Sequence, residues 1–198
     1  MPGQGKQAKT LKSRELIRLL DYVSHGRYPE RDKVMILLSF KAGMRAKEIA
    51  ALTWAMVTDA SGEVTDDIVL PNMATKGNSG RTIGINAELK CALLALRACR
   101  DADQLTPDRR VIYSERGPGY SANSVAVWFH IRYREAGIQG ASSHSGRRTF
   151  ITNAARNITA AGGSLRDVQD LAGHSSLAIT QRYIDINPDA KRKLIDMA

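Results

Sequence analysis

The segment LAGHSSLAITQRYID, residues 171–185, places His174 nine residues before Tyr183. Together the two side chains could serve a metal-free reaction at phosphorus, in which the phenol oxygen attacks and the imidazole donates to a phosphate oxygen. Taken singly, each has a simpler structural explanation, as a histidine packed in a turn and a tyrosine at the surface. The rest of the chain must therefore supply the other groups that such a reaction needs.

Metal-free cleavage of a phosphodiester also requires fixed cations, a general acid and a general base. Arginine suits the first role, because its planar guanidinium binds two phosphate oxygens and keeps its proton. Arg45 follows Gly43 at the expected start of a helix, where free N–H groups face an anion, and Glu48 can hold it in place from three residues on. A surface Arg–Glu pair explains the same pattern.

His144 and Arg147 are also three residues apart, which puts imidazole and guanidinium side by side at the expected start of a later helix. A basic first turn opposes the helix dipole, so a purely structural explanation carries a mild local cost. Lys76 lies in a loop between two expected strands, where it could protonate a leaving oxygen or simply be solvated. Further candidates for contacts with phosphate groups are Lys41, Lys47, Arg81, Ser145 and Arg148.

The elements that must position these residues are mostly helices, because apolar residues recur at spacings of three and four. One helix, over 28–43, is apolar nearly all round and is expected in the core. Two short β-branched segments, 66–72 and 80–86, predict an antiparallel hairpin whose loop carries Lys76. The other expected helices span 13–24, 46–54, 87–100, 121–137, 146–162, 164–173, 176–185 and 188–198.

Two of these helices carry specific expectations. The apolar side of the first is expected to contain Leu16, Ile17, Leu19, Leu20 and Val23. Near the end of the chain, Gly173 is expected to end the helix over 164–173 and Ser175 to cap the helix over 176–185. Tyr183 is expected to lie about two turns into that second helix.

The fold class predicted is mainly α with a small antiparallel β-sheet (α+β). A length of 198 residues suits one sizeable domain. We expect a basic flexible tail over 1–12, the main domain over 13–185, and a C-terminal helical tail over 186–198. The apolar residues of this C-terminal tail recur at four-residue spacing, so the tail could dock on a neighbouring protomer or fold back on its own domain.

The chain is basic, with 29 lysines and arginines against 20 aspartates and glutamates and a net charge of +9. Such an excess points to a polyanionic partner, of which nucleic acid is the commonest. No segment sets Lys and Arg opposite a broad apolar face, and the longest apolar run, 34–40, is too short to span a bilayer, which argues against a membrane. Cys91 and Cys99 are too far apart along one helix to bridge, so unpaired thiols indicate a reducing cytoplasm. The histidines form no metal motif.

The segments that carry these candidate residues, taken in their order along the chain, resemble the catalytic domain of the tyrosine recombinases, the phage-integrase family. GMRAKEIAALTW resembles the first arginine box, TKGNSGRTIGI the lysine hairpin, HSGRRTF the His-x-x-Arg box, and LAGHSSLAITQRY the segment with the nucleophile. The family often has an apolar residue where this chain has Gly146, and a second His where it has Arg148. Most relatives also carry an N-terminal helical domain, so the chain resembles the short, single-domain type or a fragment of a longer recombinase.

The resemblance implies a site-specific recombinase that cuts and rejoins DNA through a 3′-phosphotyrosyl intermediate, without metal, ATP or other cofactor. The implied catalytic residues are Arg45, Lys76, His144, Arg147, His174 and the nucleophile Tyr183, with Glu48 in support. Both arginines and His174 would hold the non-bridging oxygens. Lys76 would protonate the leaving oxygen, and His144 would assist proton removal from Tyr183.

The implied partners are double-stranded DNA, three further protomers in a homo-tetramer on synapsed DNA, and accessory DNA-bending proteins. The implied location is the cytoplasm at the nucleoid, in a bacterium or encoded by a phage or other mobile element. Two alternatives stay open. One is relaxation of supercoils by type IB topoisomerase-like chemistry; the other is non-enzymatic DNA binding, since AKEIAALTWAMV has the look of a helix-turn-helix.

Overall fold

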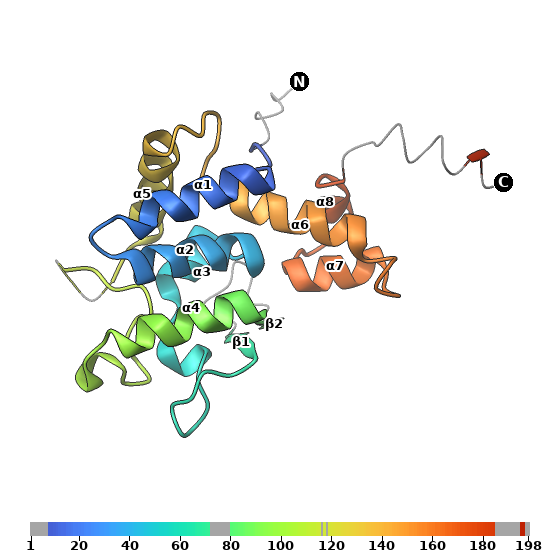
Figure 1. The fold of residues 1–198 in the computed structure, drawn as a ribbon. Helices are drawn as coiled ribbons and strands as arrows, with labels where there is room; N and C mark the ends of the chain where they lie inside the picture. The colour runs from blue at the N-terminus through green and yellow to red at the C-terminus, as the bar shows by residue number, and fades with distance from the viewer. Residues whose placement is uncertain (1–7, 72–79, 116, 118, 185–194, 197–198) are drawn as a thin grey trace. The chain divides into compact units, whose positions relative to one another are not determined.

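The computed structural model describes residues 8–71, 80–115, 117, 119–184 and 195–196 (Figure 1). In these ranges the chain is mostly helical with one two-stranded antiparallel sheet, which confirms the predicted fold class. The α-helices are α1 (Ser13–Ser24), α2 (Pro29–Lys41), α3 (Ala46–Ala51), α4 (Ala87–Ala98), α5 (Ala122–Glu135), α6 (Ser145–Asn157), α7 (Leu165–Ala172) and α8 (Leu177–Gln181). The strands are β1 (Asp67–Leu70) and β2 (Arg81–Gly84), and the 3₁₀ helices are η1 (Trp54–Met56) and η3 (Ala102–Gln104).

The chain divides into two compact units, Met1–Phe150 and Ile151–Ala198, and the division falls inside α6. The first unit holds α1 to α5, the sheet and the first residues of α6. The second unit holds the remainder of α6 together with α7 and α8. No helix in the described ranges combines the length and apolar composition needed to cross a membrane.

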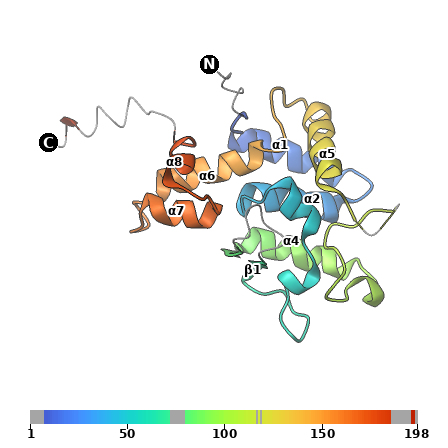
Figure 2. The same cartoon turned by 180° about the vertical axis from the view of Figure 1, so that it is seen from behind.

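The core of the first unit is built around α2, which lies between α1 and α4 in both views (Figures 1 and 2). Pro29 occupies the start of the helix, where its missing N–H costs nothing, and Glu30 and Asp32 favour the positive helix end. The predicted burial on all sides is confirmed, since the helix contributes the buried apolar residues Val34, Met35, Ile36, Leu37, Leu38 and Phe40.

Helix α1 buries a narrower stripe than its sequence predicted. Leu19 and Val23 are buried, but Ile17 is 66% exposed, so its expected place on the apolar side was wrong. Leu19 and Val23 are four residues apart and share one face, whereas Ile17 lies about 200° around the helix from Leu19. The helix therefore packs on α2 with a stripe that omits Ile17.

The sheet pairs β1 with β2 in antiparallel register, from Asp67 opposite Gly84 to Leu70 opposite Arg81. Ile68 and Ile83 are paired with each other and fully buried, which fixes one face of the ladder against the core. Arg81 is the first residue of β2 and so stands where the hairpin loop ends. Lys76, in the segment of sequence between the two strands, lies outside the described residues.

Helix α8 is shorter than the predicted helix over 176–185. Its N-cap is Ser176 rather than Ser175, and it ends at Gln181, so Tyr183 lies beyond it rather than two turns inside. The Tyr183 N–H donates to the carbonyl of Thr180 at 2.9 Å, an i to i−3 bond that tightens the chain into a turn. The predicted tail over 186–198 lies outside the described residues, except for 195–196.

Candidate active site

The carboxylate of Glu48 organises the segment that carries Arg45. Arg45 is the N-cap of α3 and Glu48 is its third residue, so the glutamate reaches back to the Arg45 N–H at 2.7 Å. The same carboxylate accepts a hydrogen bond from Arg45 Nη1 at 2.8 Å. The predicted support of Arg45 by Glu48 is present, and it fixes both the backbone and the side chain of the arginine.

Arg81 reaches the same carboxylate from β2, with Nη1 and Nη2 at 2.8 and 2.9 Å from its two oxygens. The Glu48 side chain is 0% exposed, and that of Arg81 only 6%. Burial alone would raise the pKa of Glu48, but the hydrogen bonds and charges of Arg81 and Arg45 outweigh it and lower the pKa below 4.5. Arg81 is thus an ion-pair partner of Glu48 in this structure, and its contact with a DNA phosphate stays a prediction.

Arg147 connects α6 to the segment that leads into Arg45. Its side chain is buried, and Nη1 donates to the carbonyl of Gly43 at 2.5 Å. Gly43 stands two residues before Arg45, so the structure brings the two predicted arginine boxes together through one backbone group. A buried guanidinium held by a carbonyl keeps its orientation, which a phosphate clamp needs.

Two glycines permit this approach of α6. Gly43 has a φ of 60°, in the left-handed region that favours glycine, and a Cβ there would lie 2.9 Å from Cε1 of Phe150. At Gly146 a Cβ would meet the Ser39 hydroxyl and lie 2.8 Å from Cδ2 of Phe40. The small residue that departs from the family pattern is therefore required by the contact between α2 and α6.

The residues around Arg147 have different environments. His144 is exposed, directly before α6, and its carbonyl accepts the Arg148 N–H at 2.9 Å. Ser145 is fully buried, and its hydroxyl accepts the Ser142 N–H at 2.9 Å, so it closes the turn before the helix. Arg148 is half-buried. The phosphate contacts of Ser145 and Arg148 and the proton transfer by His144 stay predictions.

Of the predicted lysines, Lys41 and Lys47 lie within the described residues. Lys41 forms an ion pair with Glu88 at 2.9 Å, and Lys47 is exposed on α3. Lys76, the predicted general acid, is outside the described residues.

The second unit brings His174 and Tyr183 into contact. Their rings stack with centroids 5.2 Å apart and planes 26° from parallel. His174 is 8% exposed, and its Nδ1 lies 3.0 Å from the Thr180 hydroxyl. The Thr152 hydroxyl donates to the Tyr183 carbonyl at 3.0 Å, which ties the tyrosine's backbone to α6.

Gly173 sets the direction of His174. It ends α7 in the left-handed conformation, with φ 59° and ψ 49°, as predicted. The His174 N–H donates to the carbonyl of Gln169, whose side-chain amide donates back to the His174 carbonyl at 3.0 Å. The histidine is therefore held by its backbone on one side and by Thr180 on the other.

Two partners in these sites were missed by reasoning from the sequence. Thr180 faces His174 from six residues on, and a hydroxyl in the middle of a short helix gave no signal of that role. Arg81 was assigned to DNA, although its place at the start of a strand beside an expected Arg45–Glu48 pair could have suggested a link. A contact across 33 residues depends on the fold and leaves no periodic trace.

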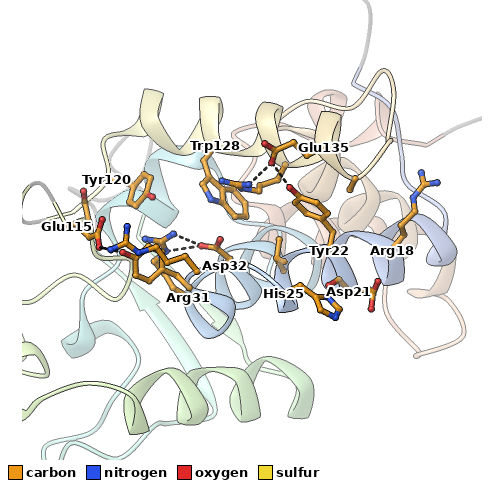
Figure 3. A pocket seen from close by; sticks show the side chains of 17 residues that line it. Arg18, Asp21, Tyr22, His25, Arg31, Asp32, Glu115, Tyr120, Trp128 and Glu135 are labelled. Atoms are coloured by element: carbon orange, nitrogen blue, oxygen red, sulfur yellow. Dashed lines mark hydrogen bonds and ion pairs between the residues drawn. The ribbon is translucent and has the colours of Figure 1, made fainter.

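A cavity of about 830 Å³ in the first unit lies among α1, α2, α5 and the segment before α5 (Figure 3). Arg31 bonds Asp32 through Nε and Nη2 at 2.9 and 2.7 Å and stands over the ring of Tyr28. Burial raises the pKa of Asp32 despite the charge of Arg31. Tyr22 and Arg132 both donate to Glu135 (Figure 3). None of the predicted catalytic or phosphate-binding residues lines this cavity.

Comparison with known proteins places the chain in a family. The model of the phage integrase family matches residues 9–189. Tyrosine recombinase XerC of Xanthomonas axonopodis pv. citri (strain 306) is 26% identical over 194 residues, or 98% of this chain and 59% of that protein. XerC of Actinobacillus pleuropneumoniae serotype 7 (strain AP76) is 29% identical over 191 residues, or 96% and 58%. The chain thus spans somewhat more than half the length of these relatives.

Solved structures of recombinases have a similar fold. The crystal structure of XerA recombinase superposes with a TM-score of 0.71 and 26% identity, over 98% of this chain and 66% of that one. The catalytic domain of bacteriophage HP1 integrase, 23% identical, gives a TM-score of 0.60 over 89% and 87%. Since the family model matches residues 9–189, which is most of the sequence, this chain belongs to the phage integrase family.

Proposed function

We propose that the chain cuts and rejoins DNA strands as a site-specific tyrosine recombinase, with Tyr183 as the nucleophile. Family membership and the XerC and XerA relatives support this activity. The observation that carries the proposal most directly is the stacking of Tyr183 on His174, which sets the phenol beside a buried imidazole. A packed tyrosine loses few conformations when it aligns for in-line attack.

In the first step, Tyr183 Oη attacks the scissile phosphorus and the bond to the 5′ oxygen breaks. The phenol proton leaves with the help of His144, and Lys76 gives a proton to the leaving oxygen. Arg45, Arg147 and His174 offset the charge that develops on the non-bridging oxygens. The products are a 3′-phosphotyrosyl protein and a free 5′-hydroxyl.

In the second step, the 5′-hydroxyl of a partner strand attacks the phosphotyrosine and releases the phenol. The number of phosphoester bonds is conserved, so the reaction needs neither ATP nor an external oxidant. We propose that no metal is required either, since the cationic side chains supply the charge that a metal would supply.

Double-stranded DNA is the proposed substrate. The net charge of +9 favours a polyanion, and structural neighbours include a Tn1549 transposon integrase in complex with circular intermediate DNA and XerH bound to difH. Exchange between two duplexes requires four active sites, so we propose a homo-tetramer on synapsed DNA, assisted by DNA-bending proteins. A bacterial cytoplasm, at the nucleoid, is the proposed location.

The two alternatives are separable. A helix-turn-helix needs a second, recognition helix soon after the first. In the structure α3 is followed by the 3₁₀ helix η1 and then by β1, which does not favour that reading. Type IB topoisomerase-like activity uses the same chemistry, and relaxation of plasmids that lack any selected site would identify it.

The experiment is covalent trapping. A duplex site is first selected from a random library by the full chain, then nicked near the cleavage point so that the short 5′-hydroxyl fragment diffuses away. We expect a protein–DNA adduct that resists denaturation and forms in EDTA without ATP. Tyr183→Phe should bind the site and give no adduct, and Tyr22→Phe, at an exposed tyrosine of α1, should react normally. An adduct with Tyr183→Phe would refute the assignment.

A further inference from the structure

The Glu48 carboxylate is saturated by two arginines from different elements. Oε1 accepts from Arg45 Nη1 and Arg81 Nη1, both at 2.8 Å. Oε2 accepts from the Arg45 N–H at 2.7 Å and from Arg81 Nη2 at 2.9 Å. A carboxylate has about four acceptor sites, so each partner occupies half of them.

The two arginines differ in what they can still do. The Arg81 side chain is 6% exposed and presents its fork to the carboxylate from β2, whereas the Arg45 side chain retains 22% exposure. Arg81 is fixed by the β1–β2 ladder, in which it faces Leu70. Of the two, only Arg45 is placed to meet solvent or a bound anion to an appreciable extent.

We propose that Arg81 is a positioning residue for the cleavage step. It keeps Glu48 ionised and oriented, and Glu48 in turn fixes both the backbone and the guanidinium of Arg45. This inference rests on the proposed function, because it assigns Arg45 to the scissile phosphate. The cluster of Arg45, Glu48 and Arg81 has a net charge of +1, so pairing still leaves positive charge for a phosphate.

Removing Arg81 has a definite consequence for Glu48. The charged groups that lower its pKa are Arg81 on β2 and Arg45 on its own helix, and burial opposes both. Without Arg81 the buried carboxylate loses half of its hydrogen bonds, so its pKa rises and it protonates at a higher pH. Protonation weakens its hold on Arg45, and cleavage slows although, on this proposal, Arg81 acts through Glu48 and not through a contact of its own with DNA.

The test compares Arg81→Met, Arg81→Lys and the double variant Arg81→Met/Glu48→Gln with the wild-type chain on the selected nicked duplex. At saturating DNA and pH 7, we expect Arg81→Met to slow adduct formation about 10-fold or more, by analogy with other lost preorganised donors. Its affinity for the duplex should change less than about 3-fold, since the proposal gives Arg81 a contact with Glu48 and none with a phosphate. Arg81→Lys should recover part of the rate, because it restores the charge without the fork.

The pH profile separates positioning from simple loss of folded protein. As the pH is lowered, Arg81→Met should begin to lose rate at a higher pH than the wild type, because its Glu48 protonates earlier, and the double variant should lose that extra dependence. Arg97→Met is the matched control, since Arg97 pairs with Glu63 in an exposed ion pair, and it should leave rate and profile unchanged. An unchanged rate for Arg81→Met, or an acid-side loss that persists in the double variant, would overturn the proposal.

Acid unfolding distinguishes failure of this inference from failure of the proposed function. The free energy of unfolding should fall less steeply on the acid side in Arg81→Met than in the wild type, because a higher pKa of folded Glu48 narrows the gap to its unfolded pKa, and this measurement needs no DNA. If the wild-type chain forms no adduct, the proposed function fails and the positioning role fails with it, while the acid-side slope still reports whether Arg81 controls Glu48. If the adduct forms and the acid-side slope does not change, the inference alone is wrong.

Discussion

Arg147 donates a hydrogen bond to the carbonyl of Gly43 at 2.5 Å, although 104 residues separate them. This bond places the buried guanidinium against the backbone that leads into Arg45. Both arginine boxes of the first unit thus depend on one short segment, 42–45, between α2 and α3. We expect that changes in this segment will affect both arginines together.

The first prediction concerns Arg147 itself. Arg147→Lys keeps the charge but loses the planar fork, so it cannot hold the Gly43 carbonyl and a phosphate in the same geometry. We expect adduct formation to fall by about 100-fold or more, the usual cost of a lost oxyanion donor. Single-turnover rates on the nicked duplex measure this, and circular dichroism should show that the variant is folded. A rate within threefold of the wild type would remove Arg147 from the clamp.

The second prediction concerns the packing of α6 on α2. Gly146→Ala inserts a methyl group against Ser39 and Phe40, and overpacking of this kind costs about 1–3 kcal/mol of unfolding free energy. Urea unfolding measures it. Gly117→Ala is the matched control, because a Cβ there has no atom within 4 Å, and it should be nearly neutral. Equal stability of the two variants would contradict the packing described for Gly146.

The third prediction concerns acid stability. Because the pKa of Glu48 is lowered on folding, its contribution is present above the unfolded value near 4.5 and is lost as pH falls through the lower folded value. We expect the free energy of unfolding to decrease as the pH falls below about 4.5. Glu48→Gln should flatten that decrease and lower stability at pH 7 by about 3 kcal/mol, as for a broken buried ion pair. A slope unchanged by the substitution would show that Glu48 is not responsible.

The fourth prediction concerns the partner of His174. Thr180→Val removes the hydroxyl that lies 3.0 Å from His174 Nδ1 and leaves the ring's stacking partner in place. We expect adduct formation to slow about 10-fold, because a ring without its second partner is less well oriented. Ser175→Ala, on an exposed serine next to His174, should have no effect. Loss of rate in both variants would point to the turn as a whole rather than to Thr180.

The sequence predicted the elements well where periodicity or turn chemistry is strong. Helix α2, the hairpin strands and Gly173 at the end of α7 follow from apolar runs, β-branched segments and a left-handed glycine. The error at Ile17 arose because all the apolar residues of the periodic segment were assigned to one side, which is a wider face than the helical period supports. The position of Tyr183 was misjudged because a five-residue helix ends by a local i to i−3 bond.

The site was predicted as residue types but not as contacts. Spacing of three residues predicted the Arg45–Glu48 pair, since helix geometry alone brings them together. The Arg81 fork on Glu48 and the Arg147 bond to Gly43 join distant parts of the chain. Such contacts depend on tertiary packing, which the local periodicity of a single sequence does not predict.

The most direct test of the central claim is to identify the atom that carries the DNA. The adduct formed on the selected nicked duplex is digested with protease and nuclease, and the nucleotide-bearing peptide is sequenced by mass spectrometry. The account predicts one modified residue, Tyr183, joined through its phenol oxygen to a 3′-phosphate. A nucleotide on any other residue, or a 5′-phosphate linkage, would contradict it.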